Sequence, residues 1–322
     1  MEGWSAELRL AVAAARAAGD VALASFGRAM DVTFKSPDQP LTAADLEANA
    51  VLYERLVGAR PEYGWLSEET ADDPRRLTRR RVWVVDPIDG TRSFIAGRPE
   101  FAISVGLAED GEAVLGVVHN PASGELYWAV RGEGAWKAVV EGAPERGVER
   151  GAGAAPGDAR PEAGDARRDA EGGALPPAHR VHVRTGSTAD QRVLLASRSE
   201  LSRGEFDPFA GGWRFTPLGS TAYKLAKLAE GAADAFLSRG PKSEWDVCAG
   251  GLLVEEAGGT ATDLRGEPLR YNHPDPSVYG ILATNGEMHR YLLGVVETLP
   301  PPPRLAYGPA ATTEPTLEED DE

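Results

Sequence analysis

The sequence predicts a layered fold of α-helices and β-sheets, and three observations support this class. Apolar residues at helical spacing open the chain, short apolar runs separated by turn residues follow, and strands alternate with helices in the second half. Antiparallel hairpins followed by alternating elements are typical of stacked layers rather than of a barrel. The chain has 322 residues and is 42% hydrophobic, which is enough for a substantial core.

The first 60 residues predict two helices. Apolar residues recur at helical spacing from Trp4 to Phe26, and Gly27 ends the pattern. Thr42 and Asp45 form a capping-box pattern, so a second helix is expected to begin there and to end at Gly58.

Short strands are expected next, and the first two end at acidic residues. Residues 64–67 lead into Glu68 and Glu69, and residues 82–85 lead into Asp86. Three further apolar runs follow. They are separated by Glu-Asp-Gly and Asn-Pro-Ala-Ser-Gly, which are turn residues suited to antiparallel hairpins. These three runs are residues 101–107, 113–119 and 125–130.

In the second half, strands and helices alternate. The predicted strands are residues 193–196, 233–237 and 279–283. The predicted helices are residues 220–230 and 246–257, the second of which ends at a Gly-Gly pair. A capping-box pattern from Thr284 to Glu287 is expected to begin the last helix.

The composition divides the chain into four parts. Residues 141–180 contain almost no large apolar side chain and cannot bury enough surface to offset the entropy of ordering, so we expect a flexible insertion. Residues 300–322 are predicted to be a disordered acidic tail. The remaining parts are an N-terminal α+β half, residues 1–140, which carries the site, and a C-terminal α/β half, residues 181–299.

Charge and cysteine content limit the partners and the location. A net charge of -16 disfavours a nucleic acid polymer, which needs clustered Lys and Arg, but it allows a small phosphorylated substrate. The single cysteine, Cys248, excludes an internal disulfide framework and predicts a cytoplasmic location. No apolar stretch approaches the ~18 residues of a membrane span, and the N-terminus lacks the layout of a secretory signal.

Acidic residues stand at the ends of several predicted elements. These are Glu68 with Glu69, Asp86 with Asp89, and Asp246. Buried carboxylates repel one another unless they are protonated or neutralised by cations, and such hard oxygen ligands suit Mg²⁺. A divalent metal site is therefore expected.

The segment between the two aspartates supports this expectation. Pro87 holds Asp86 extended, so the turn can direct both aspartates and the Ile88 carbonyl to one point. Gly90 and Thr91 then begin a predicted short helix, residues 91–96, whose backbone N–H groups can hold an anion. Metals beside an anion site predict phosphate chemistry, in which two ions activate water and stabilise the leaving oxygen.

Each acidic group also has a structural interpretation when it is taken alone. Asp-Pro and Asp-Gly are ordinary turn pairs, and Asp45 can serve only as the capping-box acid. Glu68 and Glu69 can be a solvated loop edge, and Asp246 suits the start of a helix. Their joint occurrence favours the metal site. The spacing excludes D-x-D phosphatases, EF-hands, P-loops, dinucleotide fingerprints and zinc sites.

Two segments resemble the signatures of a known family. WVVDPIDGTRSF, residues 83–94, and WDVCAGGLLVEEAGG, residues 245–259, are similar to the two signatures of the inositol monophosphatase superfamily, and LSEE at 66–69 agrees in order. The resemblance spans about residues 5–297 without the insertion. It implies an α/β/α/β/α sandwich, a Mg²⁺-dependent phosphomonoesterase with two or three ions, and allows a homodimer.

The resemblance also implies roles for individual residues. The metal ligands would be Glu68, Asp86, the Ile88 carbonyl, Asp89 and Asp246. Thr91 with Asp45 would orient and deprotonate the attacking water, with Glu69 as support. The implied substrate contacts are Glu68, Ile88, Asp89, Gly90, Thr91, Gly219, Ser220 and Asp246.

Several segments are similar to the 3'(2'),5'-bisphosphate nucleotidases of the CysQ type. They include Glu100-Phe101, Ser197-Arg198-Ser199, Gly219-Ser220 and residues 240–246, GPKSEWD. This similarity implies hydrolysis of 3'-phosphoadenosine 5'-phosphate to AMP and phosphate. An inositol-1-monophosphatase or related sugar-phosphate phosphatase is the alternative, and a non-catalytic metal- or ligand-binding scaffold is a more distant one.

Overall fold

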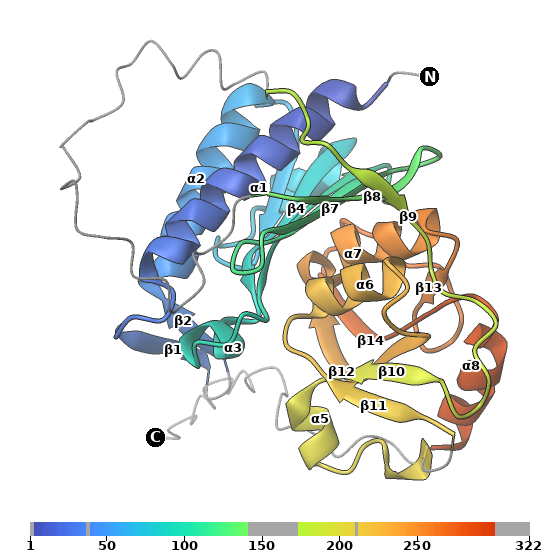
Figure 1. Cartoon of the computed structure of the whole chain (residues 1–322). Coiled ribbons are helices and arrows are strands. Elements are labelled where there is room, and N and C mark those ends of the chain that lie inside the picture. The colour runs from blue at the N-terminus through green and yellow to red at the C-terminus, as the bar shows by residue number, and fades with distance from the viewer. Residues whose placement is uncertain (1–2, 37–38, 141–172, 210–211, 300–322) are drawn as a thin grey trace, which may run out of the picture.

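The computed structural model describes residues 3–36, 39–140, 173–209 and 212–299, and they form stacked layers. Figure 1 shows helices, a sheet, helices, a second sheet and helices in this order. The predicted α/β/α/β/α sandwich is therefore confirmed. The boundaries of the four predicted parts stay a prediction, because 141–172 and 300–322 lie outside the described residues.

The first sheet has seven strands within the described residues, in the order β3-β4-β5-β6-β7-β8-β9. Their bounds are β3 Gly64–Ser67, β4 Arg81–Asp89, β5 Ala102–Glu109, β6 Glu112–Asn120, β7 Glu125–Val130, β8 Gly134–Val139 and β9 His179–Val181. β3 and β4 are parallel, and the other pairs are antiparallel. The carboxyl ends of β3 and β4 therefore meet at one edge of the sheet.

Two long helices cover the outer face of this sheet. They are α1, Ser5–Ser25, and α2, Ala43–Ala59 (Figure 1). The inward face of α1 is rich in fully buried alanines, such as Ala11 and Ala18, which let the helices approach closely. Beside them lie a hairpin of β1, Val32–Ser36, and β2, Gln39–Thr42, and the short α3, Thr91–Ile95.

The second sheet has the strand order β11-β10-β12-β14-β13. Its strands are β10 Val193–Ala196, β11 Arg214–Pro217, β12 Ala235–Ser243, β13 Thr260–Thr262 and β14 Ser277–Thr284. Helices α6, Thr221–Ala229, and α7, Glu244–Glu256, fill the layer between the sheets. Helices α5, Arg198–Ser202, and α8, His289–Thr298, lie on the far face (Figure 1).

Two glycines let α7 lie almost directly on the first sheet. A Cβ atom at Gly106 of β5 would be 2.5 Å from the Sγ of Cys248, and one at Gly116 of β6 would be 2.6 Å from the carbonyl oxygen of Ala249. Any larger residue would push the helix away. This close approach brings the start of α7, with Asp246, to the sheet edge where β3 and β4 end.

The predicted start of the last helix was wrong. Thr284 and Glu287 do not form a capping box, because the Thr284 hydroxyl accepts a hydrogen bond from Gly286 N and Glu287 instead accepts one from Gly186 N, at 3.2 Å. Helix α8 begins at His289. The sequence analysis also missed short or edge elements: β1, β2, β8, β9, β11, β13 and α5. β9 includes the last two residues of the predicted insertion.

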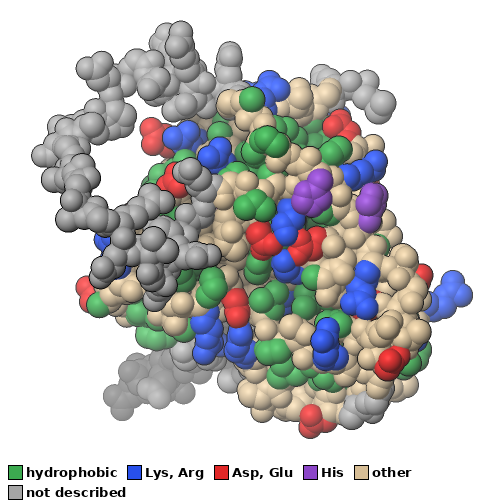
Figure 2. Space-filling model, viewed as in Figure 1, with side chains coloured by type: hydrophobic (Ala, Val, Ile, Leu, Met, Phe, Trp, Pro, Cys, Tyr) green, Lys and Arg blue, Asp and Glu red, His purple; other side chains and the backbone are tan. Residues whose placement is uncertain are grey.

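Surface charge is mixed on the face that Figure 2 shows, where acidic and basic side chains lie intermixed rather than in separate fields. Within the residues that the structure describes, no helix has both the length and the apolar character needed to cross a bilayer.

Candidate metal and phosphate site

A bulge in β4 places two aspartates on one face of the strand. Side chains alternate along a regular strand, so Asp86 and Asp89, three residues apart, would point to opposite faces. The register with β5 shifts here, because Asp86 pairs with Ser104 and Asp89 pairs with Ala102. The one extra residue in β4 reverses the alternation. Pro87, which has no N–H for the ladder, lies within this bulge.

The third aspartate comes from the start of α7. Asp246 is the third residue of this helix, and its carboxylate accepts a hydrogen bond from Ser243 N at 2.8 Å in a capping box. Ser104, the β5 partner of Asp86, donates to the Trp245 carbonyl at 3.2 Å. This bond fixes the start of α7 beside β4.

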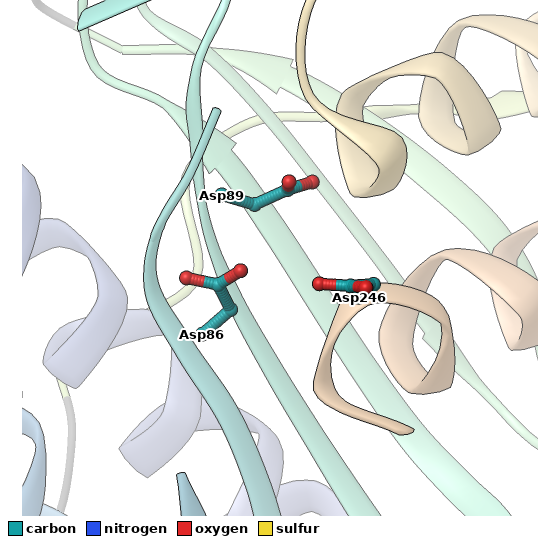
Figure 3. Close-up of side chains that lie close together, drawn as sticks. All are labelled: Asp86, Asp89 and Asp246. Carbon is teal, nitrogen blue, oxygen red and sulfur yellow. The ribbon is translucent and has the colours of Figure 1, made fainter. Parts of the chain in front are cut away.

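The three carboxylates converge, as Figure 3 shows. One oxygen from each of Asp86, Asp89 and Asp246 lies within 4.8 Å of the others, and we call this group the aspartate cluster. Burial, followed by the charges of Glu68 and the other aspartates, raises the pKa of Asp86 well above its usual value. Burial and the charges of Asp89 and Glu68 raise the pKa of Asp246 to about 7.

The donor set fits a divalent cation. The oxygens are hard ligands, Asp86 is 2% exposed and Asp89 is 7% exposed, and bringing such carboxylates together without a positive charge is unfavourable. A bound cation would offset the mutual repulsion that, after burial, raises these pKa values.

Glu68 and Glu69 follow β3 and share a lysine that the sequence analysis missed. Lys35 Nζ, on the β1–β2 hairpin, lies 2.7 Å from Glu68 and 2.8 Å from Glu69. Burial raises the pKa of Glu69 to about 7, although Lys35 opposes this and Glu68 adds to it. Lys35 is 33 residues from Glu68 in sequence, and no local pattern marks it.

Asp45 both caps a helix and reaches the site, so neither interpretation of this residue excludes the other. Its Oδ2 accepts hydrogen bonds from Thr42 N, at 2.8 Å, and from Thr42 Oγ1, at 2.6 Å. Its Oδ1 lies 3.3 Å from Thr91 Oγ1, which is also 3.1 Å from the Ile88 carbonyl oxygen. Burial raises the pKa of Asp45, although the bonds from Thr42 oppose the shift.

Gly90 and the Gly219–Ser220 turn complete the group of predicted residues. Gly90 has a φ of 100°, and a Cβ atom there would be 2.9 Å from the Glu100 carbonyl oxygen. Ser220 donates from its hydroxyl to Asp89 Oδ2 at 2.6 Å, and Ala222 N donates to the same oxygen. The structure thus brings segments from both halves to one place.

A buried lysine, Lys224, also lies beside the aspartate cluster. It is 3% exposed, its ammonium group lies 5.0 Å from the centre of the Phe236 ring, and its hydrogen bond to the Leu218 carbonyl is 3.4 Å long. Burial lowers the pKa of Lys224 to about 8, and its charge opposes the raised pKa of Asp89. Among the neighbouring charges, that of Glu200 favours the protonated form of Lys224 most strongly. Glu200 accepts hydrogen bonds from the hydroxyls of Ser197 and Ser238.

Comparison with known proteins agrees with this geometry. Residues 4–300 match the model of the inositol monophosphatase family. The chain belongs to this family. It is 36% identical to an inositol-1-monophosphatase of Rhizobium meliloti, over 81% of this chain and 87% of that protein. It is 32% identical to the 3'(2'),5'-bisphosphate nucleotidase CysQ of Escherichia coli, over 80% of this chain and 90% of that protein.

Solved structures show the same fold. The extragenic suppressor protein suhB from Bartonella henselae superposes with a TM-score of 0.69 and 26% identity, over 91% of this chain and 99% of the other. CysQ from Bacteroides thetaiotaomicron superposes with a TM-score of 0.65 and 27% identity, over 87% and 97%. As a member of the inositol monophosphatase family, the protein described here is a phosphatase that acts on small phosphorylated substrates.

Proposed function

We propose that the protein is a Mg²⁺-dependent 3'(2'),5'-bisphosphate nucleotidase that converts 3'-phosphoadenosine 5'-phosphate to AMP and phosphate. The observation that carries the choice of substrate is Lys242, a half-buried cation at the end of β12 whose charge acts on Asp246. A substrate with a second phosphate can pair with such cations, whereas the uncharged ring of an inositol monophosphate cannot.

The proposed cation ligands are Glu68, Asp86, the Ile88 carbonyl, Asp89 and Asp246, holding two or three Mg²⁺ ions. When bound, the ions would supply charge neutralisation and activation of water. Glu68 and Asp246 would also face the substrate, together with Gly219 and Ser220.

Side chains and backbone groups of the protein would transfer the proton and bind the phosphate. Thr91 Oγ1 lies 3.3 Å from Asp45, so its hydroxyl can orient the attacking water and pass a proton to that carboxylate. The raised pKa of Asp45 makes it a better base than a solvated aspartate. Glu69 would support this pair, and the backbone at Gly90 and Thr91 would hold the phosphate oxygens.

Initial rates of phosphate release test the proposal. At fixed Mg²⁺, we expect a higher kcat/KM for 3'-phosphoadenosine 5'-phosphate than for inositol 1-phosphate. Lys242→Met should reduce the first value far more than the second, because only the first substrate has a second phosphate. A strong preference of the unmodified protein for inositol 1-phosphate would overturn the proposed nucleotidase function.

A second candidate is an inositol-1-monophosphatase, favoured by the 36% identity to the Rhizobium meliloti protein. Its cation ligands and proton path would be the same, so the substrate comparison decides between the two. We also propose a cytoplasmic location, supported by the single buried cysteine, and a homodimer, which sedimentation equilibrium would test.

A further inference from the structure

One carboxylate outside the proposed ligand set joins the two halves of the chain at the site. Glu100 lies between α3 and β5, and its Oε1 accepts a hydrogen bond from Arg198 Nη2 of α5 at 2.7 Å. Its Oε2 accepts from Arg198 Nη1 and, at 2.8 Å, from the backbone N–H of Gly219. Burial would raise the pKa of Glu100, but these bonds lower it, so the ionised form is favoured.

The turn that Glu100 holds has little freedom of its own. A Cβ atom at Gly219 would lie 2.2 Å from Ser93 Oγ and 2.6 Å from the Glu100 carbonyl oxygen, so the turn packs tightly against α3 and the loop that follows it. Ser220, the next residue, has φ 59° and ψ 129°. A non-glycine residue with positive φ is strained and persists only where its surroundings fix it.

Ser220 transmits this constraint to Asp89. Its hydroxyl accepts from Tyr223 N at 2.9 Å and donates to Asp89 Oδ2 at 2.6 Å. The Ala222 N–H donates to the same Asp89 oxygen. Two donors at the start of α6, Ser220 and Ala222, therefore orient Asp89. Glu100 binds the backbone of Gly219, the residue before Ser220.

We propose that Glu100 is a positioning residue: its ion pair with Arg198 fixes the Gly219–Ser220 turn, and the turn orients the Asp89 carboxylate toward the cation. This inference rests on the proposed role of Asp89 as a cation ligand. An ion pair that only joined the two halves would contribute to folding stability and would leave cation affinity unchanged. Groups that orient a metal ligand typically change affinity 10–100-fold, so the two roles are separable.

Isothermal titration of the full chain with Mg²⁺ measures this directly, without substrate. We expect Glu100→Ala to raise the Kd for Mg²⁺ by roughly 10–100-fold. Ser220→Ala should raise the Kd by a similar factor. The double variant should have a Kd for Mg²⁺ no higher than that of the single variant with the higher Kd, because both substitutions interrupt the same connection from Glu100 through Ser220 to Asp89. Kd ratios that multiply in the double variant, or an unchanged Kd in Glu100→Ala, would overturn the inference.

Glu100→Gln guards against a folding defect. Glutamine keeps a carbonyl acceptor for the Gly219 N–H but loses the charge that binds Arg198, so we expect an intermediate Kd. Urea unfolding checks that each variant is folded. If Glu100→Ala does not fold, an unchanged Kd in Glu100→Gln is the overturning result.

A matched control comes from the pair of Glu7 and Arg60, which joins α1 and α2 at 3.0 Å with similar side-chain exposure, 12% and 27% against 19% and 38%. It lies at the end of α2 opposite Asp45, roughly 25 Å away for a helix of this length. Glu7→Gln should keep the unmodified Kd. If the unmodified protein itself binds no Mg²⁺, the proposed function and this inference are both overturned, whereas loss of the inference alone leaves wild-type binding intact.

Discussion

Two groups of buried or half-buried carboxylates lie between the first sheet and the helices beneath it, and their surroundings differ. The aspartate cluster joins β4 to α7. The second group, which we call the lysine-paired network, joins β7 and β8 to α6. It consists of Glu125, Glu230, Lys137, Lys227, Tyr127 and Tyr223.

The pKa values of Glu125 and Asp246 show how the surroundings of the two groups of carboxylates differ. Burial alone would raise the pKa of Glu125, but hydrogen bonds from Lys137, at 2.6 Å, and Tyr223, with the charge of Lys227, lower it to about 2. For Asp246, burial and neighbouring carboxylates act together and raise the pKa to about 7. The chain neutralises the lysine-paired network itself, whereas in the aspartate cluster like charges face one another and a bound cation would neutralise them. Carboxylates neutralised by the chain are expected to stabilise the fold, and carboxylates left facing one another are candidate cation ligands.

The largest expected effect comes from Asp89→Asn. Losing one ligand charge should cost several kcal/mol of transition-state stabilisation, which lowers phosphate release at saturating Mg²⁺ by at least ~100-fold. In EDTA, the free energy of unfolding should stay equal or increase, because one like charge has been removed. Initial rates and urea unfolding measure the two quantities. Undiminished activity would contradict the cation role of this residue.

Adding or removing Mg²⁺ should change thermal stability by a smaller amount. A ligand at 100 times its Kd stabilises the folded state by about 2.7 kcal/mol. For a chain of this size, this corresponds to a rise in Tm of roughly 5 °C over the EDTA-treated protein. Differential scanning calorimetry of the unmodified protein and Asp246→Asn should show the rise only in the first. Equal rises would mean that Mg²⁺ binds elsewhere.

The smallest effect is expected from Glu125→Gln, which should leave kcat/KM unchanged and lower the free energy of unfolding at pH 7 by about 1–3 kcal/mol. The folded-state pKa lies below the usual 4.5, so the stability from the charged form is present above pH 4.5 and is lost as the pH falls toward 2.

Urea unfolding of both proteins at pH 7, 5, 4 and 3 should therefore show a gap that closes on acidification. A gap that stayed constant with pH would argue against ionic stabilisation by Glu125.

The sequence predicted the site best where its residues belong to one short segment. Asp86, Asp89, Gly90 and Thr91 lie within six residues, so strand and turn chemistry alone indicated a shared location. Even there, the three-residue spacing of Asp86 and Asp89 did not show that both side chains lie on one face of the strand. Only the register with β5 shows the bulge that puts both aspartates on one face.

Contacts between distant segments could not be predicted. Lys35 meets Glu68 and Glu69 through a hairpin whose short strands were missed, and Glu100 meets Arg198 across 98 residues. The wrong capping box at Thr284 has the same cause, because Glu287 is drawn to Gly186, a partner 101 residues away.

The sequence by itself determined the layered class, most strands and helices of the interior, and the acidic segments at their ends. These depend on periodicity, caps and turns, which act within a few residues. The tertiary structure decided how the halves meet. Gly106 and Gly116 let α7 approach the sheet, and the Gly219–Ser220 turn packs against the Glu100 loop. The distance between Asp246 and β4 follows from this stacking, which no local interaction specifies.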